Sequence, residues 1–304
     1  MQEFLIRSLT SLFPVKKMRR FLREQLINYF LGPDFIKSKQ YLPFINTKKI
    51  ELESNLSIKN LFLGSSHVEY GCDPEYISST TFNMGSRSQD IVTSFLIYQY
   101  FRDKLPHLEN VVIGISLFSA GHTLSKTSES FLCNIYNIVY GFKYDSFSEY
   151  RKSRALLKYL NKKTINYNGF HKYQKAMSND ESSLLTRVDS HLRNNERTPD
   201  NIHILKSHIE MIQNDFRHAV LVYMPVHPKY RERAIQLSGK TSDELFHKTT
   251  ALADSLSVPI IDLFSSTLFS AEDFHDFDHL NLEGAKKFSL IMKKYLMERP
   301  CSAL

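Results

Sequence analysis

Residues 61–70 read LFLGSSHVEY, and this stretch decides how the chain is interpreted. Three apolar residues run into Gly64, two serines and a histidine. A short apolar run that ends in glycine is typical of a buried strand followed by a sharp turn. Two interpretations of Ser66 stay open at this point. It is either a nucleophile at the end of a strand or an ordinary turn serine that caps a following helix.

The rest of the chain indicates the fold, because short apolar runs alternate with helical patterns. The predicted strands are residues 59–64, 80–86, 110–118, 219–226 and 258–264, and the predicted helices are residues 90–105, 242–256 and 281–297. Such alternation indicates βαβ crossovers and a parallel sheet. We therefore expect an α/β fold in three layers (α/β/α), similar to flavodoxin, with a mainly parallel sheet of about five strands.

The predicted organisation is a basic N-terminal arm, residues 1–55, followed by an α/β domain, residues 56–304. The alternation stops between about residues 119 and 200, which we interpret as a helical insertion. Residues 1–30 combine basic and apolar positions in a pattern that suits helices lying on an anionic membrane surface. A helix packed on the domain, with its basic residues in solvent, would give the same pattern.

Composition narrows the function classes. The chain has 304 residues, 42% of them hydrophobic, and a formal net charge of +7. Its basic residues are interleaved with acidic ones, and no zinc-ligand spacing or phosphate-binding loop occurs, so we predict no nucleic-acid partner, no metal and no cofactor. The three cysteines stand far apart, which suits a reducing compartment. There is no apolar run of 18 residues and no pattern of a secretory signal, so we expect a cytoplasmic protein, peripheral on the inner membrane face.

Small or polar residues stand at the ends of the first three predicted strands. They are Ser65 and Ser66 at the end of the first, Asn83 and Gly85 at the end of the second, and Ser116 at the end of the third. Active sites of parallel α/β sheets gather at this edge. The loop HDFDHLNLEGA, residues 275–285, precedes the last predicted helix.

That loop supplies a base for serine chemistry. Serine needs a base to take its proton, and an imidazole base needs a carboxylate to orient it. Asp276 stands three residues before His279, so one turn can place them in contact. Asp278 is the alternative orienting acid. In a purely structural interpretation, the two aspartates cap the helix that starts near Asn281, and His279 lies at the surface.

On these residues the chain resembles the SGNH (GDSL-type) hydrolase superfamily, in particular divergent members related to the D-alanyl transfer protein of lipoteichoic acid synthesis. The matching residues are Gly64-Ser65-Ser66, Asn83-x-Gly85 and Asp276-x-x-His279. The resemblance covers residues 59–118 and 217–297. It implies Ser66 as nucleophile, His279 as base, Asp276 as orienting acid, and the backbone of Ser66 and Gly85 as oxyanion donors.

One position departs from the family pattern. The third block of the family usually carries an asparagine that donates to the oxyanion, whereas this chain has Ser116 there. Losing such a donor typically lowers the rate by about two to three orders of magnitude. Either Ser116 or Asn83 substitutes for it, or the acyl chemistry is slow or lost. His67, His227 and Cys72 are interpreted as structural.

Two functions follow as hypotheses. The first is an SGNH-type esterase or O-acyltransferase with a Ser-His-Asp triad, acting on an acylated glycan or lipid-linked glycan in bacterial surface-polysaccharide synthesis. The second is a catalytically decayed binding module that recruits a membrane or glycan partner.

Overall fold

The computed structural model describes residue 25 and residues 33–144, 156–160, 168–170, 172, 181–196 and 200–298. Most of residues 1–30, and with them the predicted membrane contact, lie outside these residues. In the part of the chain that is described, no helix is both long and apolar enough to cross a membrane.

The chain divides into two compact units. One comprises residues 1–47 and 125–164, and the other comprises residues 48–124 and 165–304. This division differs from the one expected, because helix α3 (Pro33–Ser54) crosses the boundary at residue 48. The expected insertion is also divided, since residues 165–200 belong to the second unit.

The second unit contains one five-stranded sheet in the order β2-β1-β3-β4-β5. All four strand pairs are parallel. The strands are β1 (Asn60–Leu63), β2 (Thr81–Asn83), β3 (Asn110–Ile115), β4 (His218–Tyr223) and β5 (Ile260–Asp262). Each lies within or beside a predicted apolar run, and the predicted α/β fold is confirmed.

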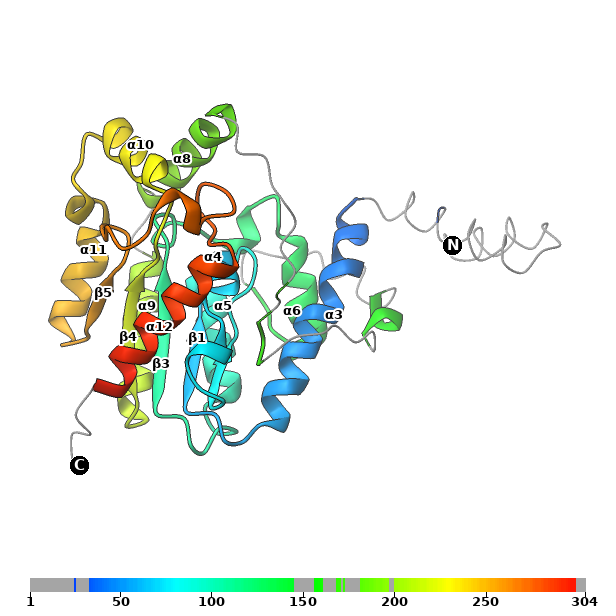
Figure 1. Ribbon diagram of the computed structural model, residues 1–304. Helices are drawn as coiled ribbons and strands as arrows, with labels where there is room; N and C mark the ends of the chain where they lie inside the picture. Colours follow the sequence, from blue (N-terminus) through cyan, green and yellow to red (C-terminus); the bar gives the residue numbers. More distant parts are fainter. Residues whose placement is uncertain are drawn as a thin grey trace. The chain divides into compact units, whose positions relative to one another are not determined.

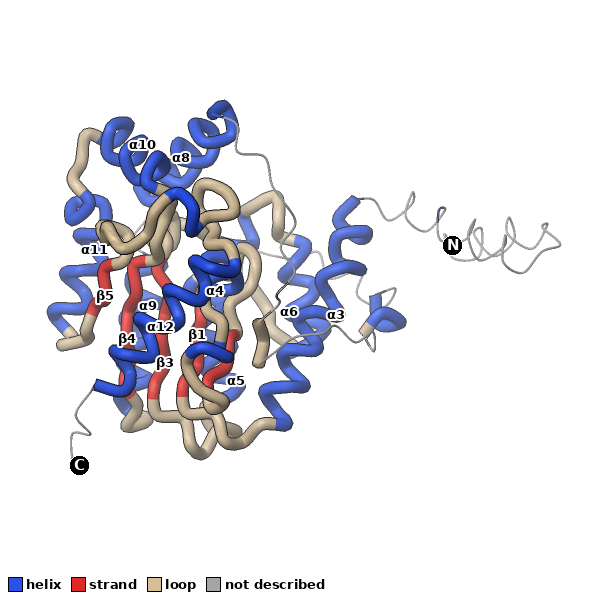
Figure 2. Tube along the Cα trace, in the orientation of Figure 1, coloured by secondary structure: helices blue, strands red, loops and turns tan. Residues whose placement is uncertain are grey.

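Helices cover the sheet on both sides (Figures 1 and 2). One face packs against α4 (Ser66–Gly71) and α12 (Leu282–Glu298), and the other carries α5 (Ile91–Phe101) and α9 (Asp200–Asn214). The other described α-helices of this unit are α8 (Glu181–Glu196), α10 (Pro228–Ser238), α11 (Ser242–Ser255) and the last part of α3. Burial on both faces explains why the three central strands, β1, β3 and β4, read as continuous apolar runs instead of alternating ones.

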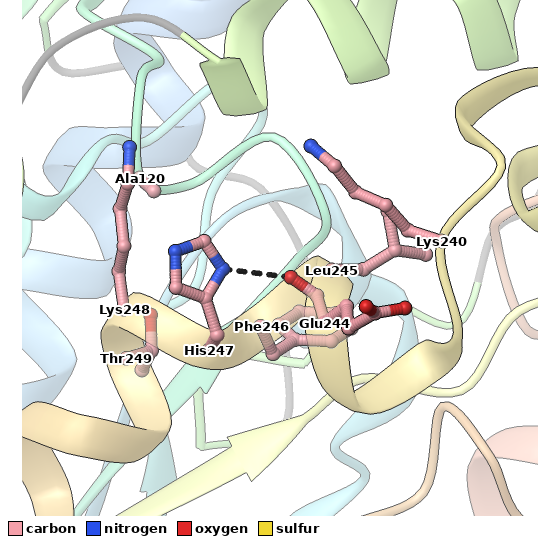
Figure 3. Close-up of a pocket in the computed structure, with 8 residues that line it drawn as sticks. All are labelled: Ala120, Lys240, Glu244, Leu245, Phe246, His247, Lys248 and Thr249. Atoms are coloured by element: carbon pink, nitrogen blue, oxygen red, sulfur yellow. Dashed lines mark hydrogen bonds between the residues drawn. The ribbon is translucent and has the colours of Figure 1, made fainter.

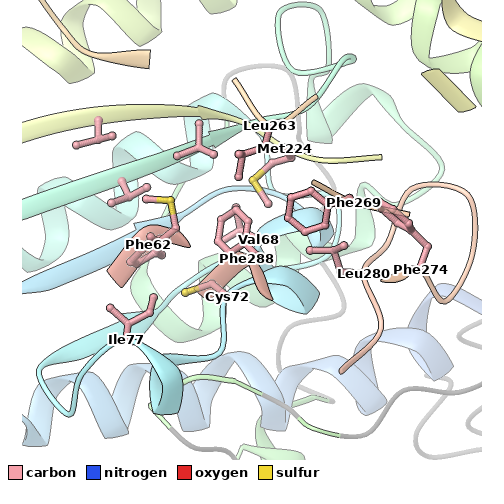
Figure 4. Packing of buried hydrophobic residues seen from close by; sticks show 14 residues of the cluster. Phe62, Val68, Cys72, Ile77, Met224, Leu263, Phe269, Phe274, Leu280 and Phe288 are labelled. Carbon is pink, nitrogen blue, oxygen red and sulfur yellow. The ribbon is translucent and has the colours of Figure 1, made fainter. Parts of the chain in front are cut away.

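The core between α4, α12 and the sheet is formed by side chains from all three (Figure 4). Phe62 of β1 and Val222 of β4 meet Val68 of α4 and Phe288 of α12, and each is at most 1% exposed. Fully burying a side chain of this kind contributes about 1.5–3 kcal/mol. The core therefore fixes α4, which carries Ser66, on the carboxyl edge of β1.

The described helices of the first unit are the first part of α3 and α6 (Phe131–Tyr140). Helix α6 ends at Gly141, whose positive φ of 79° suits a helix C-cap. The short turn Leu157–Tyr159 is tied to α3 by a hydrogen bond from the Asn46 amide to the Leu160 carbonyl, at 2.9 Å.

Candidate active site

Helix α4 begins immediately after β1, at the point that LFLGSSH indicated. The Ser65 side chain caps the helix by accepting from the His67 N–H, so Ser66 is its first residue. Gly64 has φ of +149°, a conformation that side-chain-bearing residues rarely adopt. The turn is therefore set by glycine at position 64 and by a serine cap at position 65.

The distance of α4 from the sheet depends on the Val68 side chain, which packs closely against three glycines. A Cβ atom on Gly64, Gly85 or Gly114 would lie 2.6, 2.8 or 2.2 Å from the Val68 side chain. These three glycines follow β1, follow β2 and lie within β3. Val68 can occupy this position only because all three lack a Cβ, and Ser66 is placed accordingly.

Ser66, His279 and Asp276 lie in one hydrogen-bonded row. Ser66 Oγ is 2.8 Å from His279 Nε2, and His279 Nδ1 is 2.9 and 3.0 Å from the two carboxylate oxygens of Asp276. Because a carboxylate only accepts, Nδ1 carries a proton, and in a neutral ring Nε2 accepts from the Ser66 hydroxyl. This is the arrangement that a nucleophilic serine requires.

The loop that carries Asp276 is organised by the same carboxylate. Asp276 Oδ1 accepts from the backbone N–H groups of Asp278 and His279, at 3.0 and 2.8 Å. An antiparallel bridge between Phe274 and Leu280 closes the loop. The aspartate therefore both shapes the turn and orients the imidazole, and it does not cap α12. Asn281 has that role, since its Oδ1 accepts from the Gly284 N–H.

Asp278 contacts a second histidine. His67 Nε2 is 3.1 Å from Asp278 Oδ2, and His67 Nδ1 is 2.9 Å from Ser116 Oγ, which is in turn 3.0 Å from Ser65 Oγ. Asp278 also lies 3.5 Å from His279 Nδ1, farther than Asp276 does. Asp276 is thus the nearer orienting acid of His279, while Asp278 serves His67. No motif in the sequence indicated this second row.

Arg187 of α8 joins the two rows. Its Nη1 donates to Asp276 Oδ2 at 3.0 Å and also to Asp278 Oδ1. Both carboxylates are nearly fully buried, at 2% and 3% side-chain exposure, and their negative charges would otherwise repel each other. No motif in the sequence pointed to Arg187, because it stands about ninety residues before the loop it contacts.

The charges of this cluster shift the pKa values of its members. Burial alone would lower the pKa of His279, but the carboxylates of Asp278 and Asp276 outweigh burial and raise it above the usual value. Burial lowers the pKa of His67, more than Asp278 raises it. Burial opposes ionisation of Asp278, yet its two histidines and Arg187 hold its pKa well below the usual value. The site therefore contains two carboxylates, a basic imidazole and a neutral one.

The expected oxyanion donors are largely occupied by other hydrogen bonds. The Gly85 N–H donates to Asn83 Oδ1 at 2.9 Å, and the Asn83 amide group donates to carbonyls of α4 and its end. The Ser116 N–H donates to Ser119 Oγ, also at 2.9 Å, and its hydroxyl belongs to the His67 row. Among the described residues, the Ser66 N–H has no acceptor, so it is the remaining backbone donor at the nucleophile.

The other candidates from the sequence have structural surroundings. His227 caps α10 by accepting from the Lys229 N–H, and Cys72 is fully buried, which raises the pKa of its thiol well above the usual value. Ring nitrogens of His67 and His279 and an oxygen of Asp278 lie within 4.8 Å of one another, close enough for metal ligands. The hydrogen bonds described above engage these side chains, and we assign them to that network.

A separate cavity of about 230 Å³ lies at the start of α11 (Figure 3). It is lined by Ala120, Lys240 and residues 244–249, and a hydrogen bond joins His247 Nδ1 to the Glu244 carbonyl at its wall. None of its lining residues belongs to the two hydrogen-bonded rows. Ser66 itself is partly exposed and is not among the residues that line this cavity.

Comparisons with known proteins give distant similarities. No protein-family model and no curated protein matches the sequence. Among solved structures, a protein provisionally described as a platelet activating factor from Streptococcus pneumoniae is similar, with a TM-score of 0.45, 17% identity, and coverage of 90% of this chain and 97% of that one. A GDSL-like lipase from Bacteroides thetaiotaomicron has a TM-score of 0.44 and 11% identity, with coverage of 84% of this chain and 98% of that one.

A provisionally described acylhydrolase from Bacteroides fragilis has a TM-score of 0.39 and 13% identity, covering 79% of this chain and 86% of that one. At these scores and identities the similarities assign neither a family nor an activity to this chain. None of the three descriptions mentions a D-alanyl transfer protein, and that part of the resemblance stays a prediction.

Proposed function

We propose that this chain is a serine acyl-ester hydrolase or acyltransferase with Ser66 as its nucleophile. The observation that carries the proposal is the row from Ser66 Oγ through His279 to Asp276, with contacts of 2.8 and 2.9 Å. A turn serine that only caps a helix has no reason to point at a buried, carboxylate-oriented imidazole. The cap of α4 is Ser65, and this leaves the Ser66 hydroxyl available for chemistry.

In the first step, Ser66 Oγ attacks the ester carbonyl while His279 Nε2 takes the hydroxyl proton. The tetrahedral intermediate collapses, the bond to the alcohol breaks, and His279 returns the proton to the leaving oxygen. The second step repeats this sequence with water or a sugar hydroxyl as the attacking group, which frees Ser66. Asp276 keeps the proton on Nδ1 and stabilises the imidazolium that forms in each half-reaction.

The proposed substrate is an acylated glycan or lipid-linked glycan of bacterial surface-polysaccharide synthesis. The support is the resemblance to SGNH enzymes, together with the basic residues of positions 1–30, which suit an anionic membrane surface at the inner face. Co-sedimentation with anionic and neutral vesicles tests the membrane contact. Binding to anionic vesicles alone, weakened by salt, supports it, and equal binding to both contradicts it.

Covalent labelling tests the nucleophile directly. A fluorophosphonate should label the native chain once, and Ser66→Ala should remove the label, whereas Ser57→Ala, at an exposed serine, should leave it unchanged. With a small acetyl ester, Ser66→Ala and His279→Ala should abolish turnover to similar extents because the triad acts as a unit. Asp276→Asn should retain more activity. Labelling that persists in Ser66→Ala would refute the assignment.

A decayed binding module is the second candidate, and the occupied oxyanion donors favour it. With the Gly85 and Ser116 N–H groups engaged, one backbone donor remains at Ser66. An enzyme that lacks a donor loses about 2.7–4 kcal/mol of transition-state stabilisation. In this case the native chain would bind acetylated glycans with the same affinity as Ser66→Ala and would show no fluorophosphonate labelling.

A further inference from the structure

Arg187 is the one cation among the described residues that contacts both carboxylates of the site. Its side chain reaches from α8 to Asp276 and Asp278, and each of these aspartates holds its own histidine. Asp276 Oδ2 accepts from both Arg187 and His279, at 3.0 and 2.9 Å. The arginine and the imidazole therefore donate to the same oxygen. Each of these hydrogen bonds is weaker than it would be if the other donor were absent.

We propose that Arg187 is a positioning residue that offsets part of the pull of the two carboxylates on the proton of His279, and so leaves more of this histidine neutral and able to accept the proton of Ser66. Two buried carboxylates beside one imidazole favour its protonated form, and a protonated His279 cannot take the proton of Ser66. A guanidinium shared by both carboxylates offsets part of their negative charge. In the proposed reaction, Arg187 acts on Ser66 only through the acid pair and the base.

The position of Arg187 is held by the helix around it. One turn further along α8, His191 Nδ1 is 2.7 Å from the Tyr230 hydroxyl of α10, and the His191 ring also packs on Phe118 at 4.5 Å. Val188, beside Arg187, is fully buried. The Arg187 side chain itself is 31% exposed. It is thus anchored through its helix and still accessible to a small cation from solvent.

Besides this pair, His279 interacts with His67, Glu69 and Tyr70 of α4 and with Arg187 of α8. His191 of α8 and Tyr230 of α10 act instead on Asp278 and Arg187. Burial lowers the pKa of His191 to about 3 and raises the pKa of Tyr230 well above its usual value, so neither adds a charge near neutral pH. Burial also raises the pKa of Glu69, which disfavours its negative form. Arg187 is the group in this set that carries a positive charge at every working pH.

The test is a titration of His279 that does not depend on activity. The ¹³Cε1 resonance of His279, assigned by its loss in His279→Gln, is followed against pH in the native chain, in Arg187→Gln and in Arg193→Gln. Arg193 is a matched control, because it lies on the same helix and forms an exposed ion pair with Asp189 at 2.8 Å. Arg187→Gln should raise the pKa of His279 by about one unit or more, and Arg193→Gln should leave it unchanged.

Two further variants keep the test decisive if Arg187→Gln folds poorly. Arg187→Lys keeps the charge and should leave the pKa of His279 within a few tenths of the native value. Arg187→Gly should regain the native titration on addition of guanidinium at millimolar concentration, since the site is reachable from solvent. An unchanged or lowered pKa in folded Arg187→Gln, or a pKa in Arg187→Lys as high as in Arg187→Gly, would overturn the proposal.

Activity measurements then separate this inference from the proposed function on which it rests. If the chain is an esterase, the acid limb of the Arg187→Gln rate profile should move upward with the titration, and the rate should recover above the new midpoint. A merely structural role would lower the rate equally at every pH. If no variant turns over an ester while the titrations behave as expected, the proposed function fails and the role of Arg187 stands.

Discussion

Substitution of Gly114 by alanine should displace the nucleophile through Val68. The added Cβ would lie 2.2 Å from Val68 Cγ2 and 3.0 Å from the Met224 sulfur, whereas ordinary contacts begin near 3.4 Å. Val68 and the first turn of α4 must therefore move by more than about 1 Å. Overpacking of this kind typically costs about 1–3 kcal/mol of stability. A shift of about 1 Å in a catalytic group can cost about a hundredfold in rate.

The double variant tests this mechanism. Val68→Ala alone should cost about 2–3 kcal/mol, because it removes two buried methyl groups and leaves a cavity. In Gly114→Ala/Val68→Ala the new methyl group enters the space that the old ones left. The double variant should thus be at least about 1 kcal/mol more stable than the sum of the single effects predicts. Urea unfolding measures stability, and turnover of an acetyl ester measures the placement of Ser66.

Gly239→Ala is the matched control. Gly239 also has a positive φ, 65°, but a Cβ there meets nothing within 4 Å. Gly239→Ala should therefore lower stability only through backbone strain. In the double variant with Val68→Ala, the two losses in the free energy of unfolding should simply add. Strict additivity of Gly114→Ala and Val68→Ala, with native activity in Gly114→Ala, would refute the view that the glycines set the position of α4.

Three other predictions follow from individual side chains. His279 has a raised pKa and must be neutral to accept a proton, so ester turnover should fall as the pH drops. The midpoint of this fall should lie above the usual histidine pKa of about 6.5, and a midpoint below 6.5 would contradict the charge balance of the site. Burial lowers the pKa of His208 to about 3, and both its ring nitrogens lack hydrogen-bond partners among the described residues. Below about pH 6.5 this histidine is therefore protonated in the unfolded chain but not in the folded one, which favours unfolding. His208→Leu should stabilise the protein more at pH 5 than at pH 8, as measured by urea unfolding. Phe216 is 82% exposed with φ of 58° at the end of α9, so Phe216→Gly should raise the free energy of unfolding by about 1 kcal/mol, whereas Phe216→Ala should not.

The sheet could be predicted from the sequence because its three central strands, β1, β3 and β4, are buried on both faces and read as apolar runs. Helices α5, α11 and α12 have enough turns to show a helical pattern, and each begins within a residue or two of its predicted start. Helix α4 is only six residues long and too short to show one. Helix α8 lies in a stretch that was expected to be an insertion, so its contribution to the site could not be foreseen.

The proximity of Ser66, Asp276 and His279 could be expected, since each follows a strand or precedes the last helix at one edge of a parallel sheet. The use of the backbone donors could not. Whether the Gly85 N–H faces a ligand or the Asn83 side chain depends on a rotamer that no spacing encodes. The contact of Arg187 with Asp276 could not be predicted either, because it depends on how α8 packs against α10.

The neighbouring positions Ser66 and His67 show how one short helix serves two rows. Successive residues of a helix point in directions about 100° apart, so Ser66 faces His279 while His67 turns into the core. His67 is 3% exposed and bonded to Asp278 and Ser116. Asp276 and Asp278 divide the histidines in the same way on the opposite loop. A movement of α4 would therefore lengthen the hydrogen bonds of both Ser66 and His67. Because the hydrogen bonds of His67 are buried, breaking them is costly, and this opposes the movement. We infer that this second row holds the first turn of α4 against the acid loop, and that the partly exposed Ser66 hydroxyl owes its fixed place to a buried neighbour.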